Sequence, residues 1–151
     1  MRKWFLAAGL LLALSTGIGT AMAAESQGTP AEAKAMLERA VAALKADKNK
    51  ALEMFDNRSD GFGDRDLYVY CGGPDGNFTA HYNPKVRQMS LKDLKDKSGK
   101  AFGEEIYAVA EPGKFAEVEY QWNQPGSDAL VDKVAYVTKE GDEICAVGYY
   151  K

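Results

Sequence analysis

The chain has 151 residues, which is enough for one domain of ordinary size but not for two cores joined by a linker. Hydrophobic residues make up 46% and charged residues 27%, a balance that excludes a chain disordered throughout. The net charge of −3 argues against a nucleic-acid-binding protein, which needs a basic face. One histidine and two cysteines exclude a histidine-rich metal site and a four-cysteine zinc site, and nothing in the composition predicts a cofactor.

The first 23 residues have the pattern of a secretory signal peptide. Arg2 and Lys3 precede an apolar run from Trp4 to Leu14, and Ala21-Met22-Ala23 forms an A-x-A cleavage site. The alternative is an uncleaved membrane anchor, but the eleven apolar residues fall short of the ~20 that a spanning helix needs. We therefore predict cleavage after Ala23, a mature chain without a membrane span, and a periplasmic or secreted location.

Cys71 and Cys145 are 74 positions apart and form no CxxC motif. In an oxidising compartment such a pair is most simply a structural disulfide. The alternative is a pair of buried free thiols, because cysteine also packs as a small hydrophobic residue.

The N-terminal part of the mature chain predicts a long helix from about residue 31. Apolar residues recur there at spacings of three and four, while Thr29, Pro30 and Glu32 form the pattern of a capping box with proline in the first turn. The pattern weakens at residues 47–49 and resumes for one or two turns. The acidic loop 56–66 does not have EF-hand spacing, since Arg58 and Leu67 occupy ligand positions, so we predict no metal site.

From residue 67 onward the hydrophobic period is two, which predicts strands. A hairpin is predicted from strands 67–71 and 77–81, and three antiparallel strands from 115–122, 130–138 and 143–150. Between these two groups, short helical segments are predicted at 90–96 and 101–111. The order of elements is that of an α+β fold with its helices segregated from the sheet.

Three blocks of this sequence resemble the single Cache domain family. They are DLYVYCGGPDGNFTAHYNP at 66–84, LKDLKDKSGKAFGEEI at 91–106, and VEYQWNQPGSDALVDKVAYVTKEGDEICAVGYY at 118–150. The resemblance covers about residues 31–151 and implies one Cache domain. It also implies a PAS-like five-stranded antiparallel sheet, a long N-terminal helix and short connecting helices. In that strand order the first and last strands are neighbours, which would place Cys71 beside Cys145.

The family resemblance implies an extracytoplasmic sensor of small molecules. Family members usually continue into an output domain, whereas here Lys151 follows the last predicted strand directly. We therefore expect no output domain in this chain and a separate membrane receptor or kinase as partner. Tyr82 replaces a proline that is common in the family, and Ala135 replaces a small polar residue.

Six residues are candidate ligand contacts, each with a structural alternative. His81 matches the family's A-H-x-N-P segment and could bind a carboxylate, with a pH dependence near 6–7, or make a structural hydrogen bond. Tyr120 and Trp122 share a strand face and could line the ligand wall or only pack in the core. Lys133 lies on a largely apolar strand face, where it could meet an anion or extend to water. Tyr70 and Tyr136 are included because they adjoin these motifs.

Three classes of function remain. The leading hypothesis is an exported module that binds or senses a small molecule, most simply a short carboxylate. The second is an accessory protein-interaction module whose pocket is filled by its own side chains. We do not expect an enzyme, because the sequence contains no Ser/His/Asp or Cys/His arrangement and no nucleophile elbow.

Overall fold

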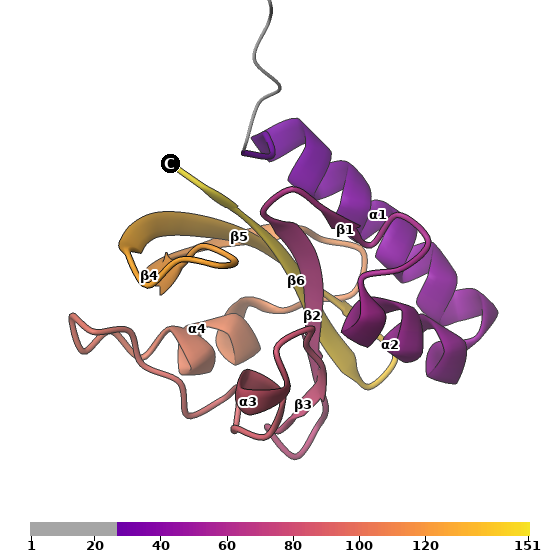
Figure 1. Ribbon diagram of the computed structural model, residues 1–151. Coiled ribbons are helices and arrows are strands. Elements are labelled where there is room, and N and C mark those ends of the chain that lie inside the picture. Colours follow the sequence, from indigo (N-terminus) through magenta and orange to yellow (C-terminus); the bar gives the residue numbers. More distant parts are fainter. Residues whose placement is uncertain (1–26) are drawn as a thin grey trace, which may run out of the picture.

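The computed structural model describes residues 27–151, and the predicted signal peptide lies outside this range. The fold is α+β, as predicted, with one antiparallel sheet and helices on both of its faces (Figure 1). In residues 27–151 no helix is long and apolar enough to cross a membrane. The elements are α1 (Pro30–Ala46), α2 (Lys48–Asn57), β1 (Gly63–Asp64), β2 (Leu67–Gly72), β3 (Phe78–Ala80), α3 (Pro84–Arg87), α4 (Phe102–Val109), β4 (Ala116–Asn123), β5 (Leu130–Glu140) and β6 (Glu143–Tyr150).

The sheet has the strand order β1-β2-β6-β5-β4, and β3 also pairs with β2. The five strands predicted from the sequence are present, and the two-residue β1 is added to them. Strand β2 therefore lies directly beside β6, as the family resemblance implied. This arrangement places Cys71 opposite Cys145, with a Cα–Cα distance of 4.1 Å, and the two form the predicted disulfide.

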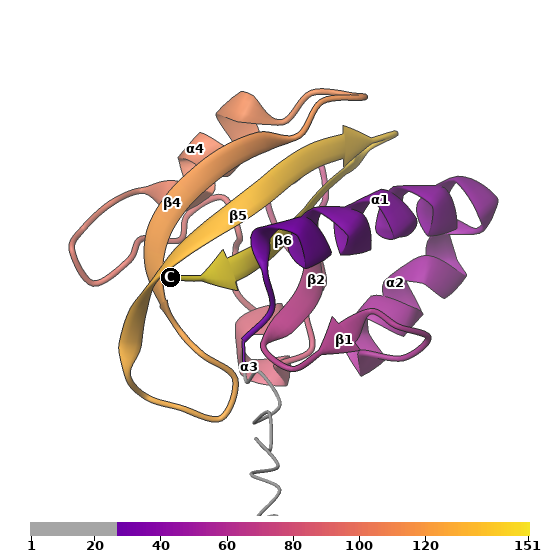
Figure 2. The same ribbon diagram turned by 90° about the horizontal axis from the view of Figure 1, so that it is seen from above.

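Helix α1 covers one face of the sheet, across β2, β5 and β6 (Figure 2). The predicted capping box is present: the Thr29 hydroxyl accepts a hydrogen bond from the Glu32 amide, and the Glu32 carboxylate accepts one from the Thr29 amide. The buried side of α1 packs on alternate residues of β2 and β6. The resulting aliphatic layer includes Met36, Leu37, Leu67, Val69, Cys71, Cys145 and Val147.

Helix α4 and the segments before it cover the opposite face of the sheet (Figure 2). The strand residues on this face are the alternates of those under α1, so on β2 they are Tyr68 and Tyr70. Phe102 of α4 stacks on Tyr120 of β4, with ring centres 4.0 Å apart. This face is consequently rich in aromatic residues.

Segment 90–96 is not the predicted helix. It forms a turn in which the Leu94 amide donates to the Leu91 carbonyl. The Asp96 carboxylate accepts hydrogen bonds from the amides of Ser98, Lys100 and Gln121, so it ties this segment to the edge of β4. An Asp side chain that bonds nearby backbone amides favours a turn over a helix, which explains the wrong prediction.

Two short elements were not predicted. Helix α3 begins where Asn83 caps the amide of Lys85 and Pro84 occupies the first turn. Strand β1 lies within the predicted loop 56–66, where Gly63 and Asp64 pair with the start of β2. Two residues are too few for a periodic pattern, so the sequence contains no signal for β1.

Candidate functional site

The candidate site lies on the α4 face, where β2, β3, β4 and α4 enclose a small inner cavity. Four of the six candidate contacts line this inner cavity: Tyr70, His81, Tyr120 and Trp122. Its volume is about 10 Å³, roughly the space of one water molecule. The remaining lining residues are Tyr68, Phe78, Val86, Leu91, Leu94 and Phe102.

Lys133 lies behind this cavity and is completely buried. Its ammonium nitrogen Nζ donates a hydrogen bond of 2.8 Å to the hydroxyl of Tyr68, whose ring lines the inner cavity. Four tyrosine rings, which we call the tyrosine box, surround the ammonium, with Nζ–centre distances of 4.3 Å for Tyr68, 4.9 Å for Tyr150, 5.5 Å for Tyr70 and 5.8 Å for Tyr120. Within residues 27–151, Lys133 forms no ion pair with a carboxylate.

The position of Lys133 follows from the register of the sheet. Lys133 on β5 is directly opposite Tyr120 on β4 and Tyr150 on β6. Its aliphatic stem lies over Gly148, where an added Cβ would be 2.2 Å from Lys133 Cε. Glycine at 148 thus leaves the space that Lys133 occupies.

Burial lowers the pKa of Lys133 from 10.5 to about 7, and the negative charge of Asp66 opposes part of this shift. A buried ammonium without a counterion is costly, because the protein interior solvates charge poorly. Near neutral pH, Lys133 therefore divides between its charged and neutral forms. An anion placed next to it would favour the charged form.

His81 follows β3 and is also buried. Its Nδ1 accepts a hydrogen bond of 3.0 Å from the amide of Asn83, so the proton of the neutral ring resides on Nε2. Burial, and then the charge of Lys133, lower the pKa of His81 to about 3. The expected pH dependence near 6–7 is therefore wrong: His81 is a neutral hydrogen-bond donor throughout the physiological range.

Tyr70 and Tyr120 are held together by a hydrogen bond of 2.8 Å between their hydroxyls. Trp122 lies edge-on to the ring of Phe102, with centres 5.6 Å apart. The two tyrosine hydroxyls are thus already paired with each other, while Trp122 contributes its ring to the cavity lining. These residues form an aromatic wall with few free polar groups.

Tyr136 is not part of this arrangement. It lies on the α1 face of the sheet, where it is partly buried and 6.0 Å from the ring centre of Tyr149. Side chains alternate along a strand, so on β5 Lys133, Ala135 and Val137 face the site and Tyr136 faces away. The structure therefore does not bring Tyr136 to the other five candidates.

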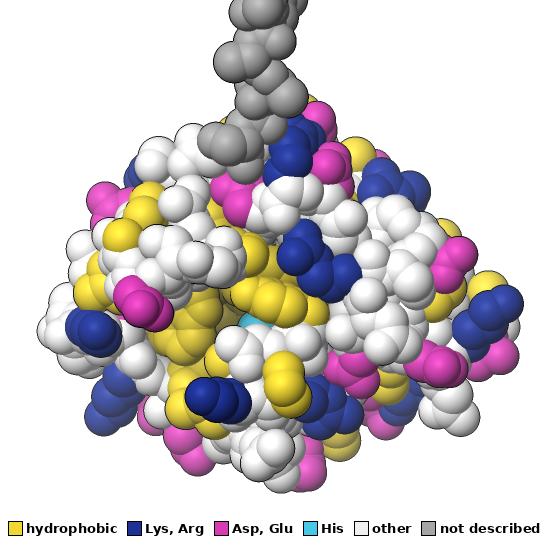
Figure 3. Space-filling model, in the orientation of Figure 1, with side chains coloured by type: hydrophobic (Ala, Val, Ile, Leu, Met, Phe, Trp, Pro, Cys, Tyr) yellow, Lys and Arg dark blue, Asp and Glu magenta, His cyan; other side chains and the backbone are white. Residues whose placement is uncertain are grey.

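A larger outer cavity of about 280 Å³ adjoins the inner one and shares His81, Val86 and Trp122 with it. The outer cavity is bounded by the end of β4 and the β4–β5 loop, whose polar residues Asn123 (on β4), Gln124, Ser127 and Asp128 line it. Figure 3 shows hydrophobic side chains gathered in the middle of this face, with the single histidine among them. His81, Val86 and Trp122 thus form the boundary between the inner and the outer cavity.

The described residues include no group of three or more His, Cys, Asp or Glu side chains that could hold a metal ion. Two acids of segment 56–66 have other partners: Asp56 accepts a hydrogen bond from the His81 amide, and Asp64 pairs with Arg65.

Several residues of the site were not found from the sequence, among them Tyr68, Phe102, Gly148 and Tyr150. Tyr68 could have been found, because it shares a strand face with Tyr70. Tyr150 and Gly148 depend on the register between β5 and β6, and Phe102 depends on how α4 packs.

The comparisons with known proteins agree with the sequence resemblance. The family model described as "Single Cache domain 2" matches residues 14–148. No curated protein matches the chain with significance.

Three solved structures are similar to this chain in fold. A methyl-accepting chemotaxis protein from Vibrio parahaemolyticus has a TM-score of 0.63 and 24% identity, covering 80% of this chain and 86% of that one. The periplasmic sensor domain of a chemotaxis protein has a TM-score of 0.57 and 22% identity, covering 78% and 86%. A Cache chemosensory domain solved to explain carboxylic acid recognition has a TM-score of 0.56 and 21% identity, covering 78% and 84%.

Proposed function

The chain belongs to the single Cache domain 2 family, and from this premise we propose that it is an exported sensor module that binds a short carboxylate. The carboxylate would approach the Lys133 ammonium and the Nε2–H of His81. Its short apolar body would lie against Tyr120 and Trp122. A separate membrane receptor or kinase would receive the signal.

The observation that carries this proposal is the environment of Lys133. A completely buried ammonium has one hydroxyl partner, Tyr68, and no ion pair with a carboxylate among the described residues. Tyrosine rings attract a cation through their negative faces, but they do not neutralise its charge. A carboxylate ligand would supply the missing negative charge and a charge-assisted hydrogen bond.

The shape and chemistry of the inner cavity support a small ligand. Sites for small molecules are mostly apolar with a few placed polar groups, and here aromatic rings surround one cation and one neutral donor. The similar Cache domain of known carboxylic acid recognition supports the same class of ligand by analogy of fold.

The second candidate function is an accessory interaction module whose pocket is filled by its own side chains. The volume of the inner cavity, about 10 Å³, favours this alternative because even acetate needs more space. Under the first proposal, Trp122 or Val86 must move to admit the ligand from the outer cavity.

A thermal-shift screen of the mature protein separates the two functions. The probes are acetate, propionate and pyruvate, with ethylamine and glucose as controls that carry no carboxylate. A sensor of short carboxylates gains thermal stability with acid concentration, because a ligand that binds only the folded state stabilises it. The controls should produce no shift.

Lys133→Met is the matched variant for this screen, because methionine fills the same space without a charge. The stabilisation by carboxylates should be lost in Lys133→Met. A response to none of the acids in the native protein would favour the filled-pocket alternative. An equal response in Lys133→Met would contradict the role of Lys133.

A further inference from the structure

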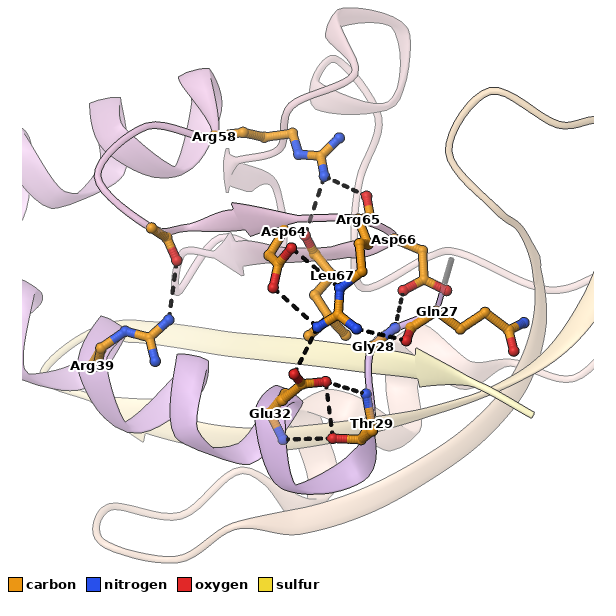
Figure 4. A network of polar contacts seen from close by, with 11 residues as sticks. Gln27, Gly28, Thr29, Glu32, Arg39, Arg58, Asp64, Arg65, Asp66 and Leu67 are labelled. Atoms are coloured by element: carbon orange, nitrogen blue, oxygen red, sulfur yellow. Dashed lines mark hydrogen bonds and ion pairs between the residues drawn. The ribbon is translucent and has the colours of Figure 1, made fainter. Parts of the chain in front are cut away.

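Asp66, directly before β2, has one carboxylate oxygen without a hydrogen-bond donor. Its side chain is 5% exposed, and its Oδ1 accepts a hydrogen bond of 2.7 Å from the amide of Gly28. Its Oδ2 is the one buried side-chain polar atom in residues 27–151 that has no hydrogen-bond partner (Figure 4). A buried carboxylate oxygen without a donor is costly, and such atoms are rare in folded proteins.

The rest of this region is fully engaged, so no neighbouring cation serves Asp66. Arg65 pairs with Glu32 and Asp64 and donates to the carbonyl of Gln27 (Figure 4). Arg58 donates to the carbonyls of Arg65 and Leu67. Asp66 is thus positioned by the Gly28 amide while one of its oxygens stays free to accept a bond.

The negative charge of Asp66 is close enough to the tyrosine box to act on Lys133 and on Tyr150. Lys133 and Asp66 nevertheless do not form an ion pair with each other. The site therefore contains a buried cation without a paired carboxylate, Lys133, and a buried carboxylate with one oxygen, Oδ2 of Asp66, that has no donor.

Asp66 lines a hollow that lies next to the outer cavity. It measures about 360 Å³ and is bounded by Arg65 and Asp66 on one side and by the β4–β5 loop on the other. This hollow shares Gln124 and Ser127 with the outer cavity. Asp66 and the proposed carboxylate site thus lie beneath the same loop.

We propose that Asp66 is a second ligand contact and that the ligand is a short carboxylate carrying a hydrogen-bond donor, a hydroxyl or an ammonium group, on a carbon next to the carboxylate. The inference rests on the proposed function. The ligand carboxylate would neutralise Lys133, and its donor would satisfy Oδ2 of Asp66. A simple fatty acid meets only the first requirement.

The test is isothermal titration calorimetry at pH 6 with propionate, lactate and alanine. These three acids share a three-carbon skeleton and differ in the group on the second carbon: hydrogen, hydroxyl or ammonium. A hydrogen bond to a charged acceptor predicts that lactate or alanine binds about ten- to a hundredfold more tightly than propionate. A preference for lactate identifies the donor as a hydroxyl, and one for alanine identifies an ammonium; both support the proposal.

Asp66→Asn is the decisive variant. Asparagine retains an oxygen for the Gly28 amide and replaces the free acceptor with a donor, so the preference over propionate should fall to near one. Asp64→Asn is the matched control: it removes a carboxylate two residues away that pairs with Arg65 instead, and it should retain the preference. Should Asp66→Asn not fold, the comparison of the three acids on the native protein still decides.

Two results would overturn the inference, and they differ in what else they affect. Propionate binding as tightly as lactate and alanine would contradict the role of Asp66 and leave the proposed carboxylate sensor intact. Binding of none of the three acids would contradict the proposed function, and with it the inference.

Discussion

The two faces of the sheet are built from the same strands but differ in chemistry. On β2, Leu67, Val69 and Cys71 face α1, whereas Tyr68 and Tyr70 face the cavity. The α1 face is mostly aliphatic next to the sheet and contains the disulfide, while the other face holds buried tyrosines, His81 and Lys133, which has no paired carboxylate.

This difference separates residues that stabilise the fold from residues that are held for another purpose. Aliphatic burial and a disulfide contribute to stability directly. A buried ammonium without a counterion lowers stability, so its presence points to function. The predictions below use this contrast, from the largest expected effect to the smallest.

Removing the disulfide should have the largest effect, confined to stability. In the chain-entropy model, a bridge that closes a loop of 74 residues stabilises the fold by about 4 kcal/mol. The variant Cys71→Ala/Cys145→Ala should lose about that much free energy of unfolding in urea titrations and should bind ligand as the native protein does. The native protein should show no free thiol when denatured without reductant; two titratable thiols per chain would reject this prediction.

Replacing Lys133 should have the opposite effect on stability. The pKa of Lys133 is about 7 in the folded protein and 10.5 as the ordinary value, so between these pH values the unfolded chain binds a proton that the folded protein does not. The free energy of unfolding of the native protein should therefore rise with pH across this interval, by at most about 1.4 kcal/mol per pH unit. In Lys133→Met this contribution to the pH dependence is absent. Below pH 7, Lys133→Met should be the more stable protein.

The difference between the two proteins in urea-derived free energies, measured from pH 6 to pH 10, tests this prediction. Subtracting the free energy of the variant from that of the native protein cancels the contributions of groups that titrate alike in both. A difference that does not change with pH would mean that folding does not lower the pKa of Lys133.

Replacing His81 should have the smallest effect. His81→Ala removes one neutral hydrogen-bond donor, so affinity for the carboxylate should fall by about three- to tenfold. Since the pKa of His81 is lowered to about 3, the ratio of native to variant affinity should be constant between pH 5.5 and 8. A ratio that changes near pH 6.5 would show that His81 titrates in the accessible range. Calorimetry at three pH values is sufficient.

The contrast between the faces was partly predictable from the sequence. Alternation along β4 and β5 placed Tyr120, Trp122 and Lys133 on apolar strand faces, and the family resemblance implied the β2–β6 pairing that joins the cysteines. The same alternation predicts that Tyr136 is not a ligand contact, because Tyr136 adjoins site residues in the sequence but points to the other face of the sheet.

Other features of the site depend on three-dimensional packing, which sequence patterns do not specify. The lowered pKa of His81 results from its burial and from the charge of Lys133, and neither can be seen in the local sequence. The tyrosine box requires the register of four strands, β2, β4, β5 and β6, and the space for Lys133 requires Gly148 on the neighbouring strand. The free oxygen of Asp66 becomes apparent only when every donor around it has been assigned.

The central claim is that Lys133 is the anion receptor of the site, and proton uptake on binding tests it most directly. Calorimetry of a bound carboxylate, lactate or propionate, in two buffers of different ionisation enthalpy gives the number of protons taken up. A carboxylate beside Lys133 raises its pKa, so the native protein should take up close to one proton at pH 8, almost none at pH 5.5, and none at either pH as Lys133→Met. Carboxylate binding at pH 8 without proton uptake would contradict the account.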